Sequence, residues 1–290
     1  MSGFDDRDGV IWKDGAYVPW RKATLHVLSH GLHYATSIFE GIRVYDSRAF
    51  MLKEHLERFF KSAAIMSLEI PYSLEELMKA SQGVIERQKI TDGYLRPVAW
   101  LGSEKMGITS QGNSTHVAIA VWEWPKYFAP EANEKGIRVM MPKWRRPPPH
   151  SAPAEAKAAG IYMLGHLARR QVEEAGFDDA LLLDHEGRLA ECTGANFFMV
   201  KSGVIYTPKP ESFLDGLTRQ TVMTLAEKEG YEMIEKDLFP KDLDGADELF
   251  ITGTAVEVTP IREVHDYGTF PVGPVTKLLR TRYQELVRKK

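Results

Sequence analysis

A single lysine stands among small residues in the stretch Ser151-Ala152-Pro153-Ala154-Glu155-Ala156-Lys157-Ala158-Ala159-Gly160-Ile161-Tyr162. The pattern that follows it predicts a helix over residues 157–175, which Gly176 ends. The default interpretation is an exposed lysine on an alanine-rich helix, but the helix dipole opposes a cation at a helix start. The alternative is a Schiff-base lysine, because the small neighbours leave room for a bulky planar cofactor and burial favours the neutral, nucleophilic amine.

A carboxylate follows in a mostly small or apolar run, Leu189-Ala190-Glu191-Cys192-Thr193-Gly194-Ala195-Asn196-Phe197-Phe198. A buried carboxylate needs a partner. In a pyridoxal phosphate enzyme that partner is the pyridine nitrogen of the cofactor, which the carboxylate keeps protonated so that the ring accepts electrons. From the residues alone, Glu191 is equally well explained as a capped or solvated side chain near a turn.

Two further segments have the features of a phosphate site. Gly216-Leu217-Thr218 opens a predicted helix, so its backbone amides and the Thr218 hydroxyl can face an anion. Gly253-Thr254 follows the apolar strand predicted at Leu249-Phe250-Ile251 and offers a second hydroxyl and further amides. Each segment alone is equally explained as a helix cap or a turn.

Composition and charge exclude several classes of protein. The 290 residues are 43% apolar and 27% charged, with 37 Lys and Arg against 40 Asp and Glu. This balance is typical of a globular protein and gives no general attraction to nucleic acid or anionic membranes. Apolar runs stay far below the roughly 20 residues of a membrane span, and the N-terminus lacks a signal-peptide pattern, so we expect a cytoplasmic protein.

Metal and disulfide chemistry have little support in the sequence. The one cysteine, Cys192, excludes an intrachain disulfide and a thiolate-rich metal cluster. His30 and His33 have a spacing that fits one metal ion on a helix, but no third ligand accompanies them, so we expect no metal.

Strand and helix signals divide the chain into two parts. Strands are predicted at 10–12, 16–18, 41–45, 49–52, 94–101, 116–124, 137–141, 180–183 and 196–200. Helices are predicted around 56–63, from a capping box at Ser73, and at 157–175, 217–228 and 275–287. We therefore expect a mixed α+β or α/β fold with a smaller N-terminal domain (1–124), a linker (125–135) and a larger C-terminal, cofactor-binding domain (136–290).

The order of these segments resembles the branched-chain aminotransferases, which are fold type IV pyridoxal phosphate enzymes with a D-amino acid aminotransferase-like fold. Besides the lysine and glutamate segments, the resemblance is carried by Ser29-His30-Gly31-Leu32-His33-Tyr34-Ala35-Thr36-Ser37-Ile38-Phe39-Glu40-Gly41-Ile42-Arg43, His55-Leu56-Glu57-Arg58, Tyr94-Leu95-Arg96-Pro97, Leu214-Asp215-Gly216-Leu217-Thr218-Arg219 and Thr252-Gly253-Thr254-Ala255-Val256-Glu257-Val258-Thr259-Pro260. The resemblance extends over nearly the whole chain.

The resemblance also implies roles for individual residues around pyridoxal 5′-phosphate. Lys157 would be the catalytic lysine, Glu191 would bind the pyridinium nitrogen, and Tyr162 would hydrogen-bond the phenolic oxygen. The phosphate would be held by Arg58, Leu217, Thr218 and Thr254. The substrate would be bound by Thr254 and Ala255 at its α-carboxylate and by Tyr34, Phe39, Gly41, Tyr94, Arg96, Trp124, Tyr127 and Tyr162 elsewhere, with Arg96 facing the distal carboxylate of glutamate.

The activity implied is transamination of leucine, isoleucine and valine with 2-oxoglutarate, by a homodimer or higher homo-oligomer that acts on small amino and 2-oxo acids. Three other fold type IV activities share the lysine and the carboxylate: D-amino acid transaminase, (R)-amine transaminase and 4-amino-4-deoxychorismate lyase. A catalytically silent cofactor-binding protein is the alternative of another class, and Lys157 argues against it.

Overall fold

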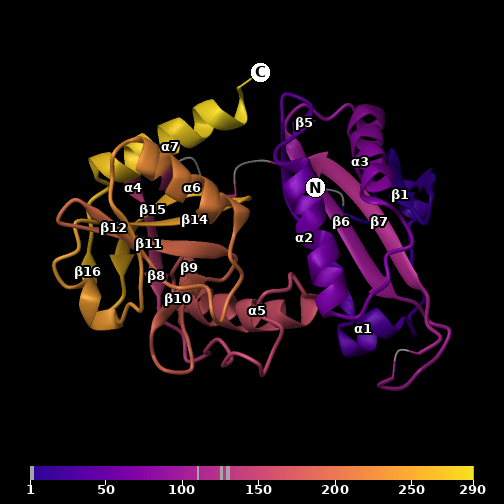
Figure 1. Cartoon of the computed structure of the whole chain (residues 1–290), viewed down its shortest axis with the longest axis horizontal. Helices are drawn as coiled ribbons and strands as arrows, with labels where there is room; N and C mark the ends of the chain where they lie inside the picture. Colours follow the sequence, from indigo (N-terminus) through magenta and orange to yellow (C-terminus); the bar gives the residue numbers. More distant parts are fainter. Residues whose placement is uncertain (1–2, 110, 125–126, 129–130, 290) are drawn as a thin grey trace. The chain divides into compact units, whose positions relative to one another are not determined.

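The computed structural model describes residues 3–109, 111–124, 127–128 and 131–289 (Figure 1). It divides into two compact units, Met1–Pro125 with Ala156–Gly160, and Lys126–Glu155 with Ile161–Lys290. The lysine segment therefore packs with the first unit. The predicted boundaries at 124 and 135 stay a prediction, and residues 125, 126, 129 and 130 of the expected linker lie outside the described part.

The first unit is an antiparallel sheet with helices on one face. The strands run in the order β2-β1-β7-β6-β4-β5, and β3 also pairs with β6. The elements are β1 (Val10–Lys13), β2 (Ala16–Pro19), the 3-10 helix η1 (Trp20–Lys22), α1 (His30–Tyr34), β3 (Ser37–Phe39), β4 (Ile42–Tyr45), β5 (Arg48–Ala49), α2 (Leu52–Ile65), α3 (Leu74–Gln88), β6 (Gly93–Leu101) and β7 (Thr115–Glu123).

Local signals explain where these elements begin and turn. Ser73 and Glu76 form the predicted capping box at the start of α3. Asp14 and Gly15 both have positive φ angles, as a tight hairpin between β1 and β2 requires. The hairpin strand predicted at 49–52 is shorter than expected, because α2 already begins at Leu52.

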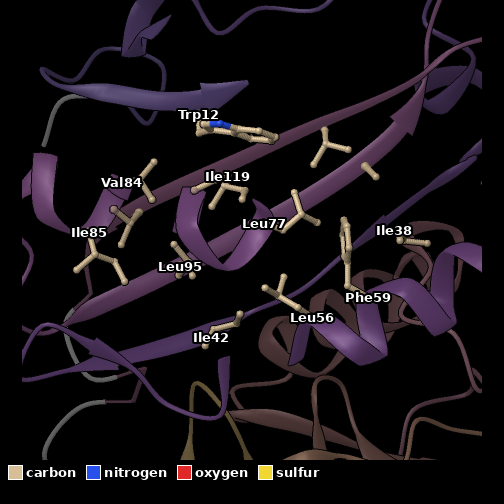
Figure 2. Packing of buried hydrophobic residues seen from close by; sticks show 14 of the residues in the cluster. Trp12, Ile38, Ile42, Leu56, Phe59, Leu77, Val84, Ile85, Leu95 and Ile119 are labelled. Atoms are coloured by element: carbon tan, nitrogen blue, oxygen red, sulfur yellow. The ribbon is translucent and has the colours of Figure 1, made fainter. Parts of the chain in front are cut away.

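The core of the first unit lies between the sheet and the two long helices. Alternate residues of β6 enter this core, which leaves Arg96, Val98 and Trp100 on the opposite face of the strand. Figure 2 shows the packing of Leu56, Phe59, Leu77, Ile42, Leu95 and Ile119. The sheet therefore has one apolar, helix-covered face and one face that presents polar and aromatic side chains.

The second unit contains a ring of strands. Its sheet runs in the order β10-β9-β8-β15-β14-β11-β12-β13, and β10 also pairs with β11, so six strands close on themselves. The elements are α4 (Ala132–Lys135), β8 (Ile137–Met140), α5 (Ala159–Glu174), β9 (Asp179–Leu183), β10 (Leu189–Cys192), β11 (Ala195–Lys201), β12 (Val204–Thr207), α6 (Leu217–Lys228), β13 (Met233–Glu235), the 3-10 helix η2 (Pro240–Leu243), β14 (Glu248–Gly253), β15 (Glu257–Val264), β16 (Gly268–Thr269) and α7 (Pro274–Val287).

Alternate residues of the ring strands form one buried apolar cluster, which includes Leu181, Cys192, Phe197 and Ile251. The outward residues of β11 and β14 include Phe198 and Phe250, whose rings stack with centroids 4.9 Å apart. Helices α6 and α7 contact β14 and each other on this side (Figure 1). The outer face of β11 and β14 is therefore partly covered by helices.

The mixed α/β class expected from the sequence is confirmed, and α6 has the predicted bounds. The helix expected from 157 begins at Ala159, because Lys157 and Ala158 remain extended. Lys157 thus precedes the helix rather than starting it. Every helix in the described part of the chain is too short or too polar to cross a membrane.

Candidate active site

Lys157 is fixed by its backbone within the first unit. Its amide donates to Ser62 Oγ of α2 at 3.0 Å, and its carbonyl accepts from the amide of Phe39 at 3.1 Å. Ala158 forms a bridge with Ile38 of β3. The Lys157 Nζ lies 5.0 Å from the centroid of the Phe39 ring. The lysine therefore extends strand pairing at β3 and presents its amine beside an aromatic face.

A buried charged cluster lies close to this lysine. Glu40 follows β3, and its carboxylate accepts two hydrogen bonds from Arg58, at 2.7 and 2.9 Å, and one from His55 Nδ1 at 2.8 Å. Burial alone would raise the pKa of Glu40, but Arg58 and His55 outweigh it and hold that pKa well below its usual range. Burial lowers the pKa of His55, and the positive charge of Lys157 lowers it further.

Five of the predicted substrate residues come together in the first unit. The Arg96 guanidinium lies 4.7 Å from the Phe39 ring centroid and 5.4 Å from that of Tyr94. The Tyr94 and Trp124 rings are 5.2 Å apart. A Cβ at Gly41 would overlap the Tyr94 hydroxyl, so a larger residue there would displace the Tyr94 ring. Phe39 is thus shared by the amine of Lys157 and the guanidinium of Arg96.

Two buried donors of this group have no hydrogen-bond partner among the described residues: Arg96 Nε and Trp124 Nε1. Buried polar atoms in native proteins are normally paired. Unsatisfied donors beside an aromatic cluster are therefore the features expected of a binding site for a polar ligand.

Glu191 of the second unit is turned outward by an irregularity in β10. Leu189 and Cys192 both point into the ring of strands, and two residues, Ala190 and Glu191, separate them. Their partners on β9 are separated by only one residue. This extra residue is a β-bulge. It leaves Glu191 opposite Asn196 on the outer face of the ring.

The Glu191 carboxylate is buried and held by two donors. Arg146, also buried, places its Nη2 atom 3.0 Å from Glu191 Oε1. Asn196 Nδ2 donates to Glu191 Oε2 at 3.4 Å. The side chain therefore keeps a fixed orientation and a balanced charge, although it lies in surroundings with little water.

A row of polar side chains leads from Glu191 to the start of α6. Asn196 pairs with Thr252 of β14 on the outer face, and the buried Thr252 Oγ1 has no partner among the described residues. Gly216 caps α6, and a Cβ there would overlap the Asn196 side-chain oxygen. The donor set, a carboxylate at one end and a helix N-terminus with the buried Thr218 at the other, fits a pyridine ring and a phosphate.

The remaining predicted site residues are placed less closely. Leu217 is the first residue of α6, and Thr254 and Ala255 form the turn between β14 and β15. Tyr162 is half-buried on α5. The other two predicted pocket tyrosines make different contacts: the Tyr34 ring is 4.6 Å from that of His30, and Tyr127 packs on Phe128.

The two histidines considered for a metal are engaged in hydrogen bonds. His30 bonds Thr36 Oγ1 and the carbonyl of Gly107, at 2.7 and 2.8 Å. His33 bonds the carbonyl of Val27 at 2.9 Å. The described residues contain no group of three or more potential ligands that could hold a metal ion.

Comparison with known proteins gives the family. The model of the class IV amino-transferases matches residues 37–264. A branched-chain-amino-acid aminotransferase of Pseudomonas aeruginosa is 43% identical over 288 residues, covering 97% of this chain and 94% of that protein. This chain belongs to the branched-chain-amino-acid aminotransferases. The expected family, enzyme class and cofactor, pyridoxal 5′-phosphate, are thereby confirmed.

The fold type of a branched-chain aminotransferase is confirmed by solved structures. The T.th. enzyme complexed with N-(5′-phosphopyridoxyl)-L-glutamate superposes with a TM-score of 0.91 at 41% identity, covering 97% of this chain and 94% of that one. The same enzyme complexed with 4-methylvaleric acid gives the same TM-score, identity and coverage. The two-unit, mixed α/β architecture described above is therefore that of the fold type IV aminotransferases.

Sequence reasoning assigned no role to several residues that, within each unit of this aminotransferase, contact the predicted site residues. Arg146 precedes three prolines, and nothing in the sequence links it to Glu191. Glu40, His55 and Asn196 lay within quoted segments, where a buried carboxylate's need for partners was the available signal.

Proposed function

We propose that this enzyme transfers the amino group of leucine, isoleucine or valine to 2-oxoglutarate, giving branched 2-oxo acids and L-glutamate. Family membership supports the reaction type. The T.th. enzyme was solved with a phosphopyridoxyl-glutamate compound, which has an acidic side chain, and with 4-methylvaleric acid, which has a branched apolar chain. A single pocket that accepts both kinds of side chain is the requirement that the proposal places on this chain.

Lys157 is assigned the central role in this proposal. Bound pyridoxal phosphate supplies an electron-accepting ring, which stabilises the negative charge left at the substrate Cα when its proton is removed. Lys157 would hold the cofactor through its Nζ atom in the resting enzyme, and once the substrate amine has taken its place the freed Nζ would move that proton. Glu191 binds the pyridine nitrogen, and the Tyr162 hydroxyl hydrogen-bonds the phenolic oxygen. The outward position of Glu191 and its pairing with Arg146 support this assignment.

The phosphate is assigned to Arg58, the start of α6 and the turn at Thr254. The amides of Leu217 and Thr218 lie in the first turn of α6, where the helix dipole favours an anion. Glu40 holds the Arg58 guanidinium in one orientation through two hydrogen bonds. A fixed guanidinium loses little side-chain entropy when it binds an anion.

The observation that carries the substrate proposal is the position of Arg96 beside Phe39. Phe39, Gly41, Tyr94 and Trp124 supply apolar surface for a branched side chain, and Arg96 supplies a positive charge for the distal carboxylate of glutamate. Tyr34 and Tyr127 complete the proposed pocket, with part of it donated by a second subunit. The α-carboxylate is assigned to Thr254 and Ala255.

A donor screen with purified enzyme tests this function. We expect single-turnover conversion of the bound cofactor by L-leucine, L-isoleucine, L-valine and L-glutamate. We also expect D-alanine and (R)-1-phenylethylamine to react at least about 100-fold more slowly, because the D-amino acid places its Cα proton wrongly when its carboxylate is bound, and the amine has no carboxylate to bind. Preference for the D-amino acid or the (R)-amine would contradict the proposal and favour the related fold type IV activities.

We further propose that the enzyme is a cytoplasmic homodimer, or a larger assembly of dimers. Seven apolar side chains of the first unit, in and before α1 and in the loop whose Gly107 carbonyl is bonded by His30, are 42% to 87% exposed; we call them the α1 patch, namely Leu25, Val27, Leu28, Leu32, Tyr34, Met106 and Ile108. Exposed apolar groups of this extent support an interface with a second copy. The buried cysteine, Cys192, whose thiol pKa is raised by burial, suits a reducing compartment.

A further inference from the structure

Arg146 is a buried arginine whose two ends contact different parts of the second unit. Its Nη2 atom is 3.0 Å from Glu191 Oε1, and its Nε atom donates to the carbonyl of Ser212 at 3.1 Å. Its backbone amide donates to the carbonyl of Leu183 in β9 at 2.9 Å. The planar guanidinium therefore connects the Glu191 carboxylate to the segment that leads into α6.

Asn196 makes a second connection between the same two parts. Its Nδ2 atom donates to Glu191 Oε2 at 3.4 Å and to the carbonyl of Leu214 at 3.0 Å. Its side-chain oxygen packs so closely on Gly216 that a side chain at that position would overlap it. Glu191 is thus tied at each of its oxygens to residues 212–214, directly before the N-terminus of α6.

The geometry points to Arg146 as a positioning residue that fixes the separation between Glu191 and the start of α6. This inference rests on the proposed function, in which Glu191 binds the ring nitrogen and α6 binds the phosphate. A rigid ligand that must contact both ends at once binds well only if their separation is correct before it arrives. Arg146 is therefore expected to matter most for a ligand that carries both the ring and the phosphate.

A purely structural role predicts a different pattern. If the buried ion pair only supported the fold, breaking it would weaken the binding of every ligand of the unit by the same factor. A positioning role predicts a selective loss, because pyridoxal without its phosphate can shift with a displaced Glu191, whereas pyridoxal phosphate is held at its other end. The ratio of the two affinities therefore separates the two roles.

Arg145 is a matched control, because it is adjacent and of the same chemistry but exposed, with a 3.4 Å contact to the carbonyl of Asp184. Arg146→Met removes the charge and both side-chain contacts of Arg146. Arg146→Lys keeps the charge, but one ammonium cannot reproduce the planar two-ended contact. If Arg146→Met does not fold, Arg146→Lys decides the question alone.

The experiment measures the dissociation constants of pyridoxal phosphate and pyridoxal for the apo forms of full-length wild type and variants, with absorbance spectra of the bound ligand. We expect Arg146→Met and Arg146→Lys to raise the dissociation constant of pyridoxal phosphate at least about tenfold and that of pyridoxal less than about threefold. Arg145→Met should match the wild type. The absorbance spectrum of bound pyridoxal phosphate should change in the Arg146 variants alone.

Unchanged affinity, or equal losses for both ligands, would overturn the inference and leave the proposed function intact. Failure of the wild type to bind pyridoxal phosphate would overturn both. In a Glu191→Gln variant, the additional substitution Arg146→Met should raise the dissociation constant of pyridoxal phosphate by less than about threefold, because the effects of substituting residues that act through one another are not additive. Multiplicative losses there would also contradict the inference.

Discussion

At the scale of single residues, the aromatic ring of Phe39 organises the chemistry of the first unit. The amine of Lys157 and the guanidinium of Arg96 lie 5.0 and 4.7 Å from its centroid. Two cations beside one ring are both held by its negative face, although they repel each other. The amine to which we assign the reaction and the charge to which we assign substrate selection therefore lie beside the same ring.

The first residue-scale prediction concerns the reactive lysine. Lys157 lies in an extended segment fixed by Ser62 and Phe39, so its side chain is presented by rigid backbone. Borohydride treatment of the holoenzyme should attach the cofactor to the tryptic peptide that contains Lys157. The Lys157→Ala variant should not take up this label, and its turnover rate should fall at least about 1,000-fold, as expected for removal of a nucleophile. Label on another lysine would refute the assignment.

The second concerns acid stability. His55 is buried, and its pKa is lowered from the usual 6.5. The unfolded chain therefore binds a proton on His55 that the folded chain does not, and stability falls as the pH drops below about 6.5. Glu40, whose pKa is also lowered, adds a second loss below its usual value of 4.5.

Thermal unfolding between pH 7.5 and 5.5 should therefore show a smaller acid-induced loss in His55→Gln than in the wild type. The slope for one proton is at most about 1.4 kcal/mol per pH unit. The exposed His33, which bonds only the Val27 carbonyl among the described residues, gives the control, and His33→Gln should follow the wild type. Parallel profiles for all three proteins would show that His55 is not the titrating group.

Sequence patterns indicate the residues that we assign to the chemistry more clearly than they indicate the partners of those residues. Lys157 and Glu191 stand out because each is a charged residue in an apolar or small run. Arg146 has no such signal, since an arginine before three prolines is normally exposed. Its role depends on a contact between residues far apart in the sequence, which a single sequence does not contain.

At the scale of secondary-structure elements, the helices were predicted more accurately than the strands. The bounds of α6 follow from its amphipathic pattern, whereas β3, β10, β12, β13, β15 and β16 were not predicted. Except for β15, these strands have two to four residues, too few for a clear alternation. The bulge in β10 was also missed, because it depends on the register with β9.

An element-scale prediction concerns the phosphate. Arg58 projects from α2, and Glu40 holds its guanidinium. Arg58→Ala should weaken pyridoxal phosphate binding at least about 30-fold and pyridoxal binding less than about threefold, because the lost charge-assisted contacts involve only the phosphate. Equilibrium titration of the apoenzyme measures both. Arg87, exposed on α3 over the Tyr17 ring, provides the matched control, Arg87→Ala. Equal losses for the two ligands would show another role for Arg58.

At the scale of the whole molecule, the α1 patch predicts assembly. Ile108, which is 87% exposed, lies next to Gly107, whose carbonyl is bonded by His30 of α1. Sedimentation should show a dimer or larger species, and Ile108→Asp should shift it toward monomer, because a buried charge in an apolar interface is costly. Tyr267 is an exposed aromatic residue of the second unit, and Tyr267→Asp is the control. A fully active wild-type monomer would contradict the proposal.

The proposed catalytic cycle places the strongest demand on the molecule, since it requires one pocket to accept both an apolar and an anionic side chain. Burial of the distal carboxylate of glutamate without a partner is expensive, so glutamate needs a positioned cation and leucine does not. Arg96, with its buried Nε atom unpaired among the described residues, is the side chain that we assign to this task.

Stopped-flow measurement of the two half-reactions of Arg96→Leu tests this account most directly. We expect the apparent dissociation constant for L-glutamate to rise at least about 100-fold, because loss of one member of a buried charged pair costs roughly 3–5 kcal/mol, while that for L-leucine changes less than about threefold. A fall of both half-reactions by the same factor would show that Arg96 holds the α-carboxylate or the fold, and would contradict the proposed basis of dual substrate recognition.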